Sequence, residues 1–371
     1  MSKNSAKTKI QSLLSHADVK INGDRPWDLQ VLDERFYNRV LSEGALGLGE
    51  SYMDGDWESK EMDVMFDRII RADLESKVQP LKMLLPVAKA WVVNKQRKSK
   101  AFDIGEHHYD IGNDMYERML DKRMTYTCGY WREAETLEQA QEAKLDLICR
   151  KIGLKKGDTV LDIGCGWGSF LGYAAEKYGV KGTGITVSKE QIQLAKVKYS
   201  HLDIEFRYQD YRDLNEKFDH IVSVGMFEHV GPKNYETYMK IASQCLKDDG
   251  LFLLHTIGTN HTKTAIDPWT DKYIFPGGKL PTLEQVAKSS EHHFYLRDLH
   301  NFGGDYDTTL LAWYENFKAS WPELEGYDER FYRMWRFFLL SAAGAFRANR
   351  NTLWQFVFSK KSYSSLYDSV R

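Results

Sequence analysis

Residues 158–169 read DTVLDIGCGWGS, and this pattern predicts a buried strand, a tight glycine-rich turn and the start of a helix. Similar strand-like runs follow, separated by helical patterns. The runs are VKGTGIT, DIEFRY, HIVSVG and GLFLLHT, and the helical patterns are SFLGYAAEKY, SKEQIQLAKVKYS and YETYMKIASQCLKDD. Strands that alternate with helices predict an α/β fold with a doubly wound, Rossmann-like parallel sheet, whose ligands bind at the carboxyl ends of the strands.

The glycine-rich turn carries the first evidence about a ligand. Glycines let the backbone turn tightly and approach a bound molecule more closely than side chains would allow. The spacing G-x-G-x-G and the acid directly before it favour S-adenosylmethionine (SAM) over a dinucleotide, whose pyrophosphate is cradled by G-x-G-x-x-G. A purely structural turn is the alternative. The residues assigned to SAM here are Asp162, Gly164, Gly166 and Gly168.

The expected SAM site departs from the common pattern at the second strand. In such folds this strand usually ends in an acid that holds the ribose hydroxyls, but here it ends in GITVSKEQ. Thr186 and Gln191 can hydrogen-bond the ribose instead, which changes the type of polar group without removing the site. After the third strand, Asp210 and Tyr211 stand where the adenine is expected.

Composition excludes several classes of protein. The formal net charge of −2 over 371 residues gives no basic field of the kind that marks nucleic-acid binders. The four cysteines show no CxxC spacing, as is typical of a reducing cytosol, and no His/Cys pair has the spacing of metal ligands. No window approaches the roughly 18 uninterrupted apolar residues of a spanning helix, and we expect no signal peptide. We therefore expect a cytoplasmic protein that at most lies on a membrane.

The chain is expected to divide near residue 100. Apolar residues recur at helical spacing in 29–44 and 62–77, which predicts a small, mostly helical N-terminal domain over 1–95. Residues 83–102, MLLPVAKAWVVNKQRKSKAF, join a hydrophobic stretch to four basic side chains. Such a segment can lie on anionic lipid head groups. A solvated linker after a core helix is the alternative.

Six motifs together carry a resemblance that spans essentially the whole chain. They are HYDIGNDMYERMLDKRMTYTCGYW, DIGCGWG, GITVSKEQ, GMFEHVG, LLHTIG and HNFGGDYDTTLLAW. In this order they resemble the cyclopropane-fatty-acyl-phospholipid synthases, which are SAM-dependent enzymes related to the mycolic-acid cyclopropane synthases. The resemblance implies a class I SAM-dependent methyltransferase domain over 96–371, with its sheet core in 155–310 and a helical acyl-pocket region in 311–371.

The same resemblance implies a reaction and its setting. SAM would give a methylene group to the cis double bond of an unsaturated acyl chain in a membrane phospholipid. It also implies a homodimer that associates peripherally with the inner face of the membrane. An acyl tunnel would draw on the aromatic and aliphatic residues of 267–281 and 330–346, although an aromatic stripe at helical spacing is more often plain core.

That reaction requires a base in a pocket from which water is excluded. An alkene that attacks SAM leaves a carbocation, and ring closure then requires a proton to be removed from the added methyl group. The resemblance implies a bound bicarbonate as this base, held by Cys128, Glu228, His255, Tyr306 and the backbone of Ile257. It also implies that Tyr126 and Thr127 close over SAM, within a lid over 103–131.

Each of these residues also has a purely structural interpretation. Cys128 can be a small buried hydrophobe, and His255 can be a core histidine with its hydrogen bonds satisfied. Glu228 can cap the helix predicted in PKNYETYMK, and Tyr306 can simply pack. Three alternatives stay open for the whole protein. They are a small-amine methyltransferase, an enzyme that makes a methyl- or methylene-branched lipid, and a SAM-binding protein without chemistry.

We predict that replacing Lys95, Arg97, Lys98 and Lys100 together by Gln weakens binding to anionic phospholipid vesicles. Each basic side chain near an anionic surface contributes about 1 kcal/mol to binding. Vesicle co-sedimentation measures the effect, and neutral vesicles serve as the control, since there the variant and the parent should differ little. Unchanged sedimentation with anionic vesicles would remove the membrane role of this segment.

Overall fold

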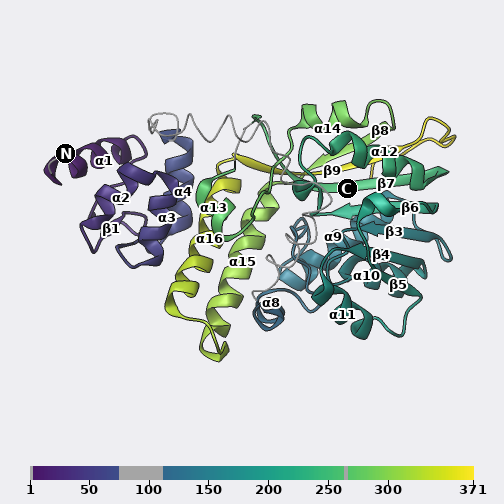
Figure 1. Ribbon diagram of the computed structural model, residues 1–371, viewed down its shortest axis with the longest axis horizontal. Coiled ribbons are helices and arrows are strands. Elements are labelled where there is room, and N and C mark those ends of the chain that lie inside the picture. The colour runs from purple at the N-terminus through teal and green to yellow at the C-terminus, as the bar shows by residue number, and fades with distance from the viewer. Residues whose placement is uncertain (1–2, 75–111, 263–265) are drawn as a thin grey trace. The chain divides into compact units, whose positions relative to one another are not determined.

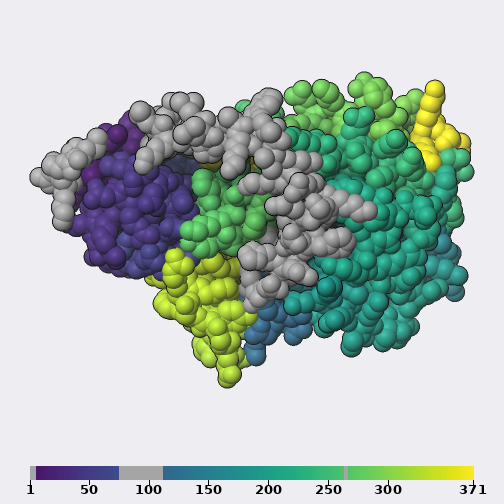
Figure 2. All heavy atoms as spheres, in the orientation of Figure 1, coloured from purple at the N-terminus to yellow at the C-terminus, as the bar shows by residue number. Residues whose placement is uncertain are grey.

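The computed structural model describes residues 3–74, 112–262 and 266–371, and the other residues are drawn in grey in Figure 1 and Figure 2. The basic segment over 83–102 and the first part of the proposed lid, 103–111, lie outside the described residues. Contacts within the chain divide it into two compact units. No helix among the described residues has both the length and the apolar character needed to cross a membrane.

The first unit combines the N-terminal region with two later segments, Lys263–Pro276 and Tyr306–Asn351. Its main elements are α1 (Lys3–Ser15), β1 (Gln30–Val31), α2 (Arg35–Glu43), α3 (Ala45–Met53), β2 (Trp57–Glu58), α4 (Met62–Arg71), α13 (Pro268–Tyr273), most of α15 (Gly304–Ser320) and α16 (Glu329–Arg347).

An aromatic core explains why α16 belongs to this unit. The ring of Phe337 in α16 lies 4.6 Å from that of Trp269, 5.3 Å from that of Phe66 and 5.7 Å from that of Tyr52, measured between centroids. The sequence grouped 311–371 with the catalytic half, whereas residues 306–351 pack with the N-terminal helices because of these contacts. The acyl tunnel stays a prediction.

The second unit is built on a seven-stranded sheet with the order β5-β4-β3-β6-β7-β9-β8. The strands are β3 (Thr159–Ile163), β4 (Lys181–Thr186), β5 (Ile204–Tyr208), β6 (Phe218–Val224), β7 (Leu246–Thr259), β8 (Tyr295–Asn301) and β9 (Asn351–Ser359). The pairs β3–β4, β4–β5, β3–β6 and β6–β7 are parallel, and β8 pairs with β9 antiparallel. The expected doubly wound α/β sheet is confirmed.

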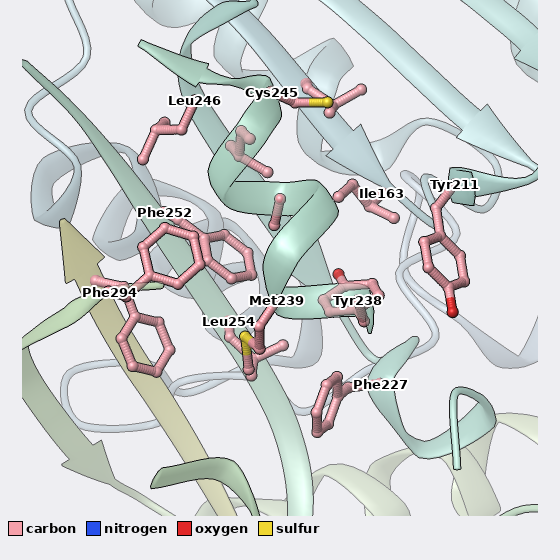
Figure 3. Close-up of a cluster of buried hydrophobic side chains, with 14 of the residues drawn as sticks. Ile163, Tyr211, Phe227, Tyr238, Met239, Cys245, Leu246, Phe252, Leu254 and Phe294 are labelled. Carbon is pink, nitrogen blue, oxygen red and sulfur yellow. The ribbon is translucent and has the colours of Figure 1, made fainter. Parts of the chain in front are cut away.

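Helices cover both faces of this sheet (Figure 1). One face carries α9 (Leu137–Lys151), α10 (Ser169–Tyr178) and α11 (Lys189–Lys198), and the other carries α12 (Tyr235–Cys245) and α14 (Leu283–Ser290). Because side chains alternate along a strand, a strand buried on both faces is apolar throughout. In β7, Phe252 and Leu254 pack with α12 (Figure 3), whereas Leu251 and Leu253 pack with the helices of the opposite face.

The order of the strands locates the expected ligand crevice. From β3 the sheet continues through β4 in one direction and through β6 in the other. Such a reversal opens a crevice beyond the carboxyl ends of the strands, and ligands bind there in open α/β sheets. The loops that follow β3 and β6 are the glycine-rich turn and the segment that contains Glu228.

Candidate active site

The glycine-rich turn and the loop after β6 meet at the point where the strand order reverses. Gly164, Gly166 and Gly168 all have positive φ angles, which favour glycine. At Gly164 the close approach also excludes a side chain, because a Cβ there would lie only 2.6 Å from the Cβ of Met226. The hydroxyl of Ser223 donates a hydrogen bond of 3.1 Å to the carbonyl of Ile163, which ties the two strand ends together.

Asp162, at the end of β3, is a buried acid. It is 2 % exposed, and burial raises the pKa of its carboxyl to about 7, with the charge of Lys144 acting in the opposite direction. Its Oδ1 atom has no hydrogen-bond partner within the described part of the chain. A buried carboxyl with a free acceptor is costly unless a ligand completes it.

The residues expected at the ribose lie together. The hydroxyl of Thr186 donates to Oε1 of Gln191 at 3.0 Å, and both side chains are buried. Thr186 ends β4, and Gln191 lies in the first turn of α11, where Ser188 caps the helix by accepting from the backbone N–H of Gln191. The strand end and the helix start therefore present one joint polar surface.

The residues expected at the adenine, Asp210 and Tyr211, make most of their contacts with other residues of the protein. Asp210 accepts hydrogen bonds from the backbone N–H of Arg212 at 2.9 Å and from its guanidinium at 3.0 Å. The ring of Tyr211 lies 5.1 Å from that of Tyr238 in the hydrophobic core, and its hydroxyl has no partner among the described residues. The two residues are neighbours at the end of β5, but much of their bonding capacity is used within the fold.

Two residues of α9 hold the segment that the sequence places over SAM. Lys144 Nζ donates to the hydroxyl of Thr127, and Gln141 Nε2 donates to its backbone carbonyl, each at 2.7 Å. Thr127 in turn lies against the turn after β6, because a Cβ on Gly225, whose φ is +73°, would meet its Cγ2 at 2.6 Å. Thr127 is therefore fixed from two sides.

Sequence reasoning missed Lys144 and Gln141, although a signal was present. Residues 137, 141, 144 and 148 follow helical spacing and all four are buried, so two polar side chains interrupt the apolar stripe of α9. Lys144 has no exposed surface, and burial lowers the pKa of its ammonium to about 8, while Asp121 heads the charges that raise it. A buried cation is tolerated only where anions or hydrogen bonds compensate it.

Tyr126 joins the glycine-rich turn through a chain of rings. Its ring lies 5.2 Å from that of Tyr116 in α8 (Asn113–Met119), which lies 5.2 Å from that of Trp167 in the turn. Cys128 is fully buried, and its thiol donates to the carbonyl of Gly129 at 3.2 Å. The described end of the proposed lid thus contacts both ligand-facing loops.

Glu228 lies in a short 3-10 helix, η2 (Phe227–His229), directly after β6. Its Oε1 atom accepts a hydrogen bond of 2.6 Å from the backbone N–H of Ile257, whereas Oε2 has no partner in the described residues. Burial raises the pKa of this carboxyl to about 7, against the hydrogen bonds that lower it. Glu228 does not cap α12, whose N-cap position is Asn234.

His255 lies within β7, two residues before the Ile257 whose backbone N–H bonds Glu228. The backbone N–H of Gly225 bonds the carbonyl of His255 at 2.9 Å, which joins the ends of β6 and β7. The imidazole is 1 % exposed, and burial, with the charges of Lys144 and Lys151, lowers its pKa well below the ordinary value. Its Nδ1 atom lies 3.2 Å from Nε2 of Gln355 in β9, and its Nε2 atom has no partner in the part of the chain described.

The proposed anion ligands are thus brought together in part. Glu228 follows β6, His255 and Ile257 lie in the adjacent strand β7, and the N–H of Ile257 is already used by Glu228. Tyr306 belongs to the first unit, where its ring lies 4.4 Å from that of Phe346 and 6.0 Å from that of Trp313. Among the described residues, no group of His, Cys, Asp and Glu side chains is placed to hold a metal ion.

Comparisons with known proteins agree with this fold. Structurally, the chain is similar to the SAM-dependent methyltransferases. The cyclopropane synthase MmaA2 from Mycobacterium tuberculosis has a TM-score of 0.66 at 33% identity, covering 70% of this chain and 98% of that one. The cyclopropane synthase CmaA1, solved with S-adenosylhomocysteine and CTAB, also scores 0.66, at 32% identity over 70% of this chain and 98% of that one.

Sequence comparison identifies the family. Residues 96–356 match the family model described as mycolic acid cyclopropane synthetase. The cyclopropane-fatty-acyl-phospholipid synthase of Escherichia coli K12 is 53% identical over 350 residues, which cover 94% of this chain and 92% of that protein. The chain belongs to the mycolic acid cyclopropane synthetase family.

We predict that Lys144→Met raises the dissociation constant of SAM by roughly tenfold, because a hydrogen bond to a charged group contributes about 1.5–3 kcal/mol. The change should also lower the melting temperature, since it leaves the hydroxyl of Thr127 without its donor and the buried Asp162 without a compensating charge. Isothermal titration calorimetry and thermal unfolding measure the two effects. Lys177→Met, at an exposed position of α10, is the matched control. Unaltered SAM affinity would show that the lysine does not support the cofactor site.

We predict that Glu228→Gln stabilises the protein at pH 8 but not at pH 5. The pKa of this carboxyl is 4.5 in the ordinary state and about 7 when folded, so burial of its charge costs about 3 kcal/mol above pH 7. Below pH 4.5 both states hold the proton and the cost vanishes; between these limits stability falls as pH rises. Thermal unfolding against pH measures the difference, with the exposed Glu236→Gln as control. If Glu228→Gln and the parent protein had equal melting temperatures at pH 8 as well as at pH 5, the result would contradict a buried, ionisable Glu228.

Proposed function

We propose that this chain is a SAM-dependent cyclopropane-fatty-acyl-phospholipid synthase. It transfers a methylene group from SAM to the cis double bond of an unsaturated acyl chain in a membrane phospholipid. The observation that carries the proposal is the buried carboxyl of Glu228, which bonds the backbone of Ile257, two residues along β7 from His255. One oxygen of this carboxyl and Nε2 of His255 both lack a partner among the described residues. Membership of the family and 53% identity to a protein of that name support the same activity.

SAM is proposed to lie across the carboxyl ends of β3 and β4. The backbone of Gly164, Gly166 and Gly168 admits its amino-acid part, and the buried Oδ1 of Asp162 offers an acceptor there. Thr186 and Gln191 bond the ribose, while Asp210 and Tyr211 flank the adenine. Thr127, held by Lys144 and Gln141, covers the methyl donor together with Tyr126.

The residues around Glu228 suit a small anion. Two buried polar atoms, Glu228 Oε2 and His255 Nε2, lack protein partners among the described residues, and buried polar atoms without partners call for a ligand. A carboxyl whose pKa is about 7 can hold a proton near neutral pH and donate it as a hydrogen bond, which removes the repulsion between two negative charges. Bicarbonate, when bound here, supplies the base that accepts the proton lost on ring closure.

Each protein group then has a defined part in the reaction. The alkene attacks the sulfonium methyl and S-adenosylhomocysteine forms, which leaves a carbocation on the acyl chain. Glu228 and His255 orient the proton acceptor toward the new methyl group, with Cys128 and Tyr306 completing the proposed set and the backbone N–H of Ile257 holding Glu228. Loss of one methyl proton gives the electron pair that closes the ring. A small-amine methyltransferase needs no such proton acceptor, because its nucleophile already carries the lone pair.

The substrate also sets where the enzyme must work. Because phospholipid acyl chains lie inside a bilayer, we propose peripheral contact with the cytoplasmic face of the membrane. The N-terminal region and the basic segment over 83–102 are the proposed contact, and a homodimer is the proposed assembly.

The direct experiment is incubation of the protein with SAM and vesicles of a monounsaturated phospholipid, followed by gas chromatography–mass spectrometry of the released acyl chains. A chain heavier by one CH₂ that resists hydrogenation supports a cyclopropane ring. A heavier chain that still takes up hydrogen indicates a methylene-branched product. A protein that binds SAM and leaves every lipid unchanged would contradict the proposal and favour a small-amine substrate.

We predict that Glu228→Gln lowers kcat on such vesicles by at least about 100-fold, a typical loss for a group that takes part in proton transfer. The dissociation constant of SAM should change less than about twofold, because Gln keeps the acceptor for the backbone N–H of Ile257. Steady-state kinetics and calorimetry provide both numbers, and Glu236→Gln again serves as control. Equal losses in turnover and SAM binding would make Glu228 a structural residue.

A further inference from the structure

We infer that Gln355 is a positioning residue that fixes the imidazole of His255 with its proton on Nε2, as a hydrogen-bond donor to the proposed anion. This inference rests on the proposed function and assigns a residue to the same site. Gln355 lies in β9, a strand between β7 and β8 in the sheet. The amide nitrogen of Gln355 lies 3.2 Å from Nδ1 of His255, and both side chains are at most 1 % exposed.

The position of Gln355 in β9 is costly for the fold. Its neighbours in the strand, Leu353, Trp354, Phe356 and Val357, are apolar and buried on one face of the sheet or the other. A buried amide without full hydrogen bonding costs free energy, and Oε1 of Gln355 has no partner in the described residues. An apolar residue would serve packing better, so the contact with His255 is the reason the structure offers for a glutamine here.

The contact determines which ring nitrogen carries the proton. An amide N–H donates, so the Nδ1 that faces it must present a lone pair. Among the described residues no carboxylate is hydrogen-bonded to the ring, and burial together with the charges of Lys144 and Lys151 opposes its protonation. A neutral imidazole that accepts at Nδ1 carries its proton on Nε2. Nε2 is the atom that has no partner among the described residues.

This tautomer separates the roles of the two residues beside the proposed anion. His255 donates from Nε2 and therefore cannot take the proton that leaves the new methyl group at that atom. The Nε2–H group of His255 instead orients the anion. The contact with Gln355 prevents the imidazole from presenting a lone pair to that anion. Adjacent strands supply the arrangement, since odd-numbered residues of β7 and β9, such as Leu253 and Val357, face the same side of the sheet as α9.

The test is the nitrogen NMR spectrum of the full-length protein labelled with ¹⁵N-histidine, with the His255 signals assigned by their loss in His255→Asn. The wild-type protein should show a protonated Nε2 and a bare Nδ1. Gln355→Glu should reverse this pattern, because a carboxylate accepts from an Nδ1–H. Gln355→Leu, which offers no partner, should show both tautomers. Leu353→Met, a buried change in the same strand, should leave the spectrum as in the wild type.

Kinetics on phospholipid vesicles give a second readout. Gln355→Glu and Gln355→Leu should each lower kcat by at least about tenfold, as removal of an orienting partner commonly does, with little change in SAM affinity. A proton on Nδ1 in the wild type, or a spectrum unaltered by Gln355→Glu, would overturn the inference. The spectrum needs no turnover, so a protein with the expected tautomer but no lipid product would contradict the proposed function alone.

Discussion

The hydrogen bond from the backbone N–H of Ile257 to the carboxyl of Glu228 is the contact on which the rest of the site depends. At 2.6 Å it ties the loop after β6 to the end of β7 and fixes one oxygen of a buried acid. The other oxygen is left without a protein partner in the described residues. A group in this condition destabilises the fold and is retained only where a ligand or a reaction uses it. The strand order around β3 explains why it stands beside the glycine-rich turn.

The hydrophobic core around the site offsets the destabilisation that its buried polar atoms cause. Apolar clusters on both faces of the sheet bury its central strands, so the fold can carry several uncompensated polar atoms. Those atoms come from three strands: Asp162 from β3, His255 from β7 and Gln355 from β9. The low dielectric around them raises the pKa of the acids and keeps the imidazole neutral. Proton transfer and hydrogen-bond donation near neutral pH follow from the same burial.

Local patterns predicted the parts of this protein whose structure is local. The glycine-rich turn and the alternation of strands and helices could be predicted because neighbouring residues determine them. Lys144 and Gln355 could not, since their partners Thr127 and His255 lie 17 and 100 residues away and only the packed sheet brings them close. The grouping of Tyr306–Asn351 with the N-terminal helices was missed for the same reason. The sequence nevertheless contains a signal for both Lys144 and Gln355, because each is a polar residue within a run of apolar ones.

In the proposed reaction, the site removes a proton from the methyl group it has just transferred. SAM carrying a fully deuterated methyl group, given to the enzyme with monounsaturated phospholipid vesicles, tests this directly. Mass spectrometry of a hydrogenation-resistant acyl product should find two deuterium atoms per added carbon, the third having left with the base that Glu228 and His255 orient. A product that retains all three would show that no proton is taken from the methyl group, and would contradict the role assigned to this site.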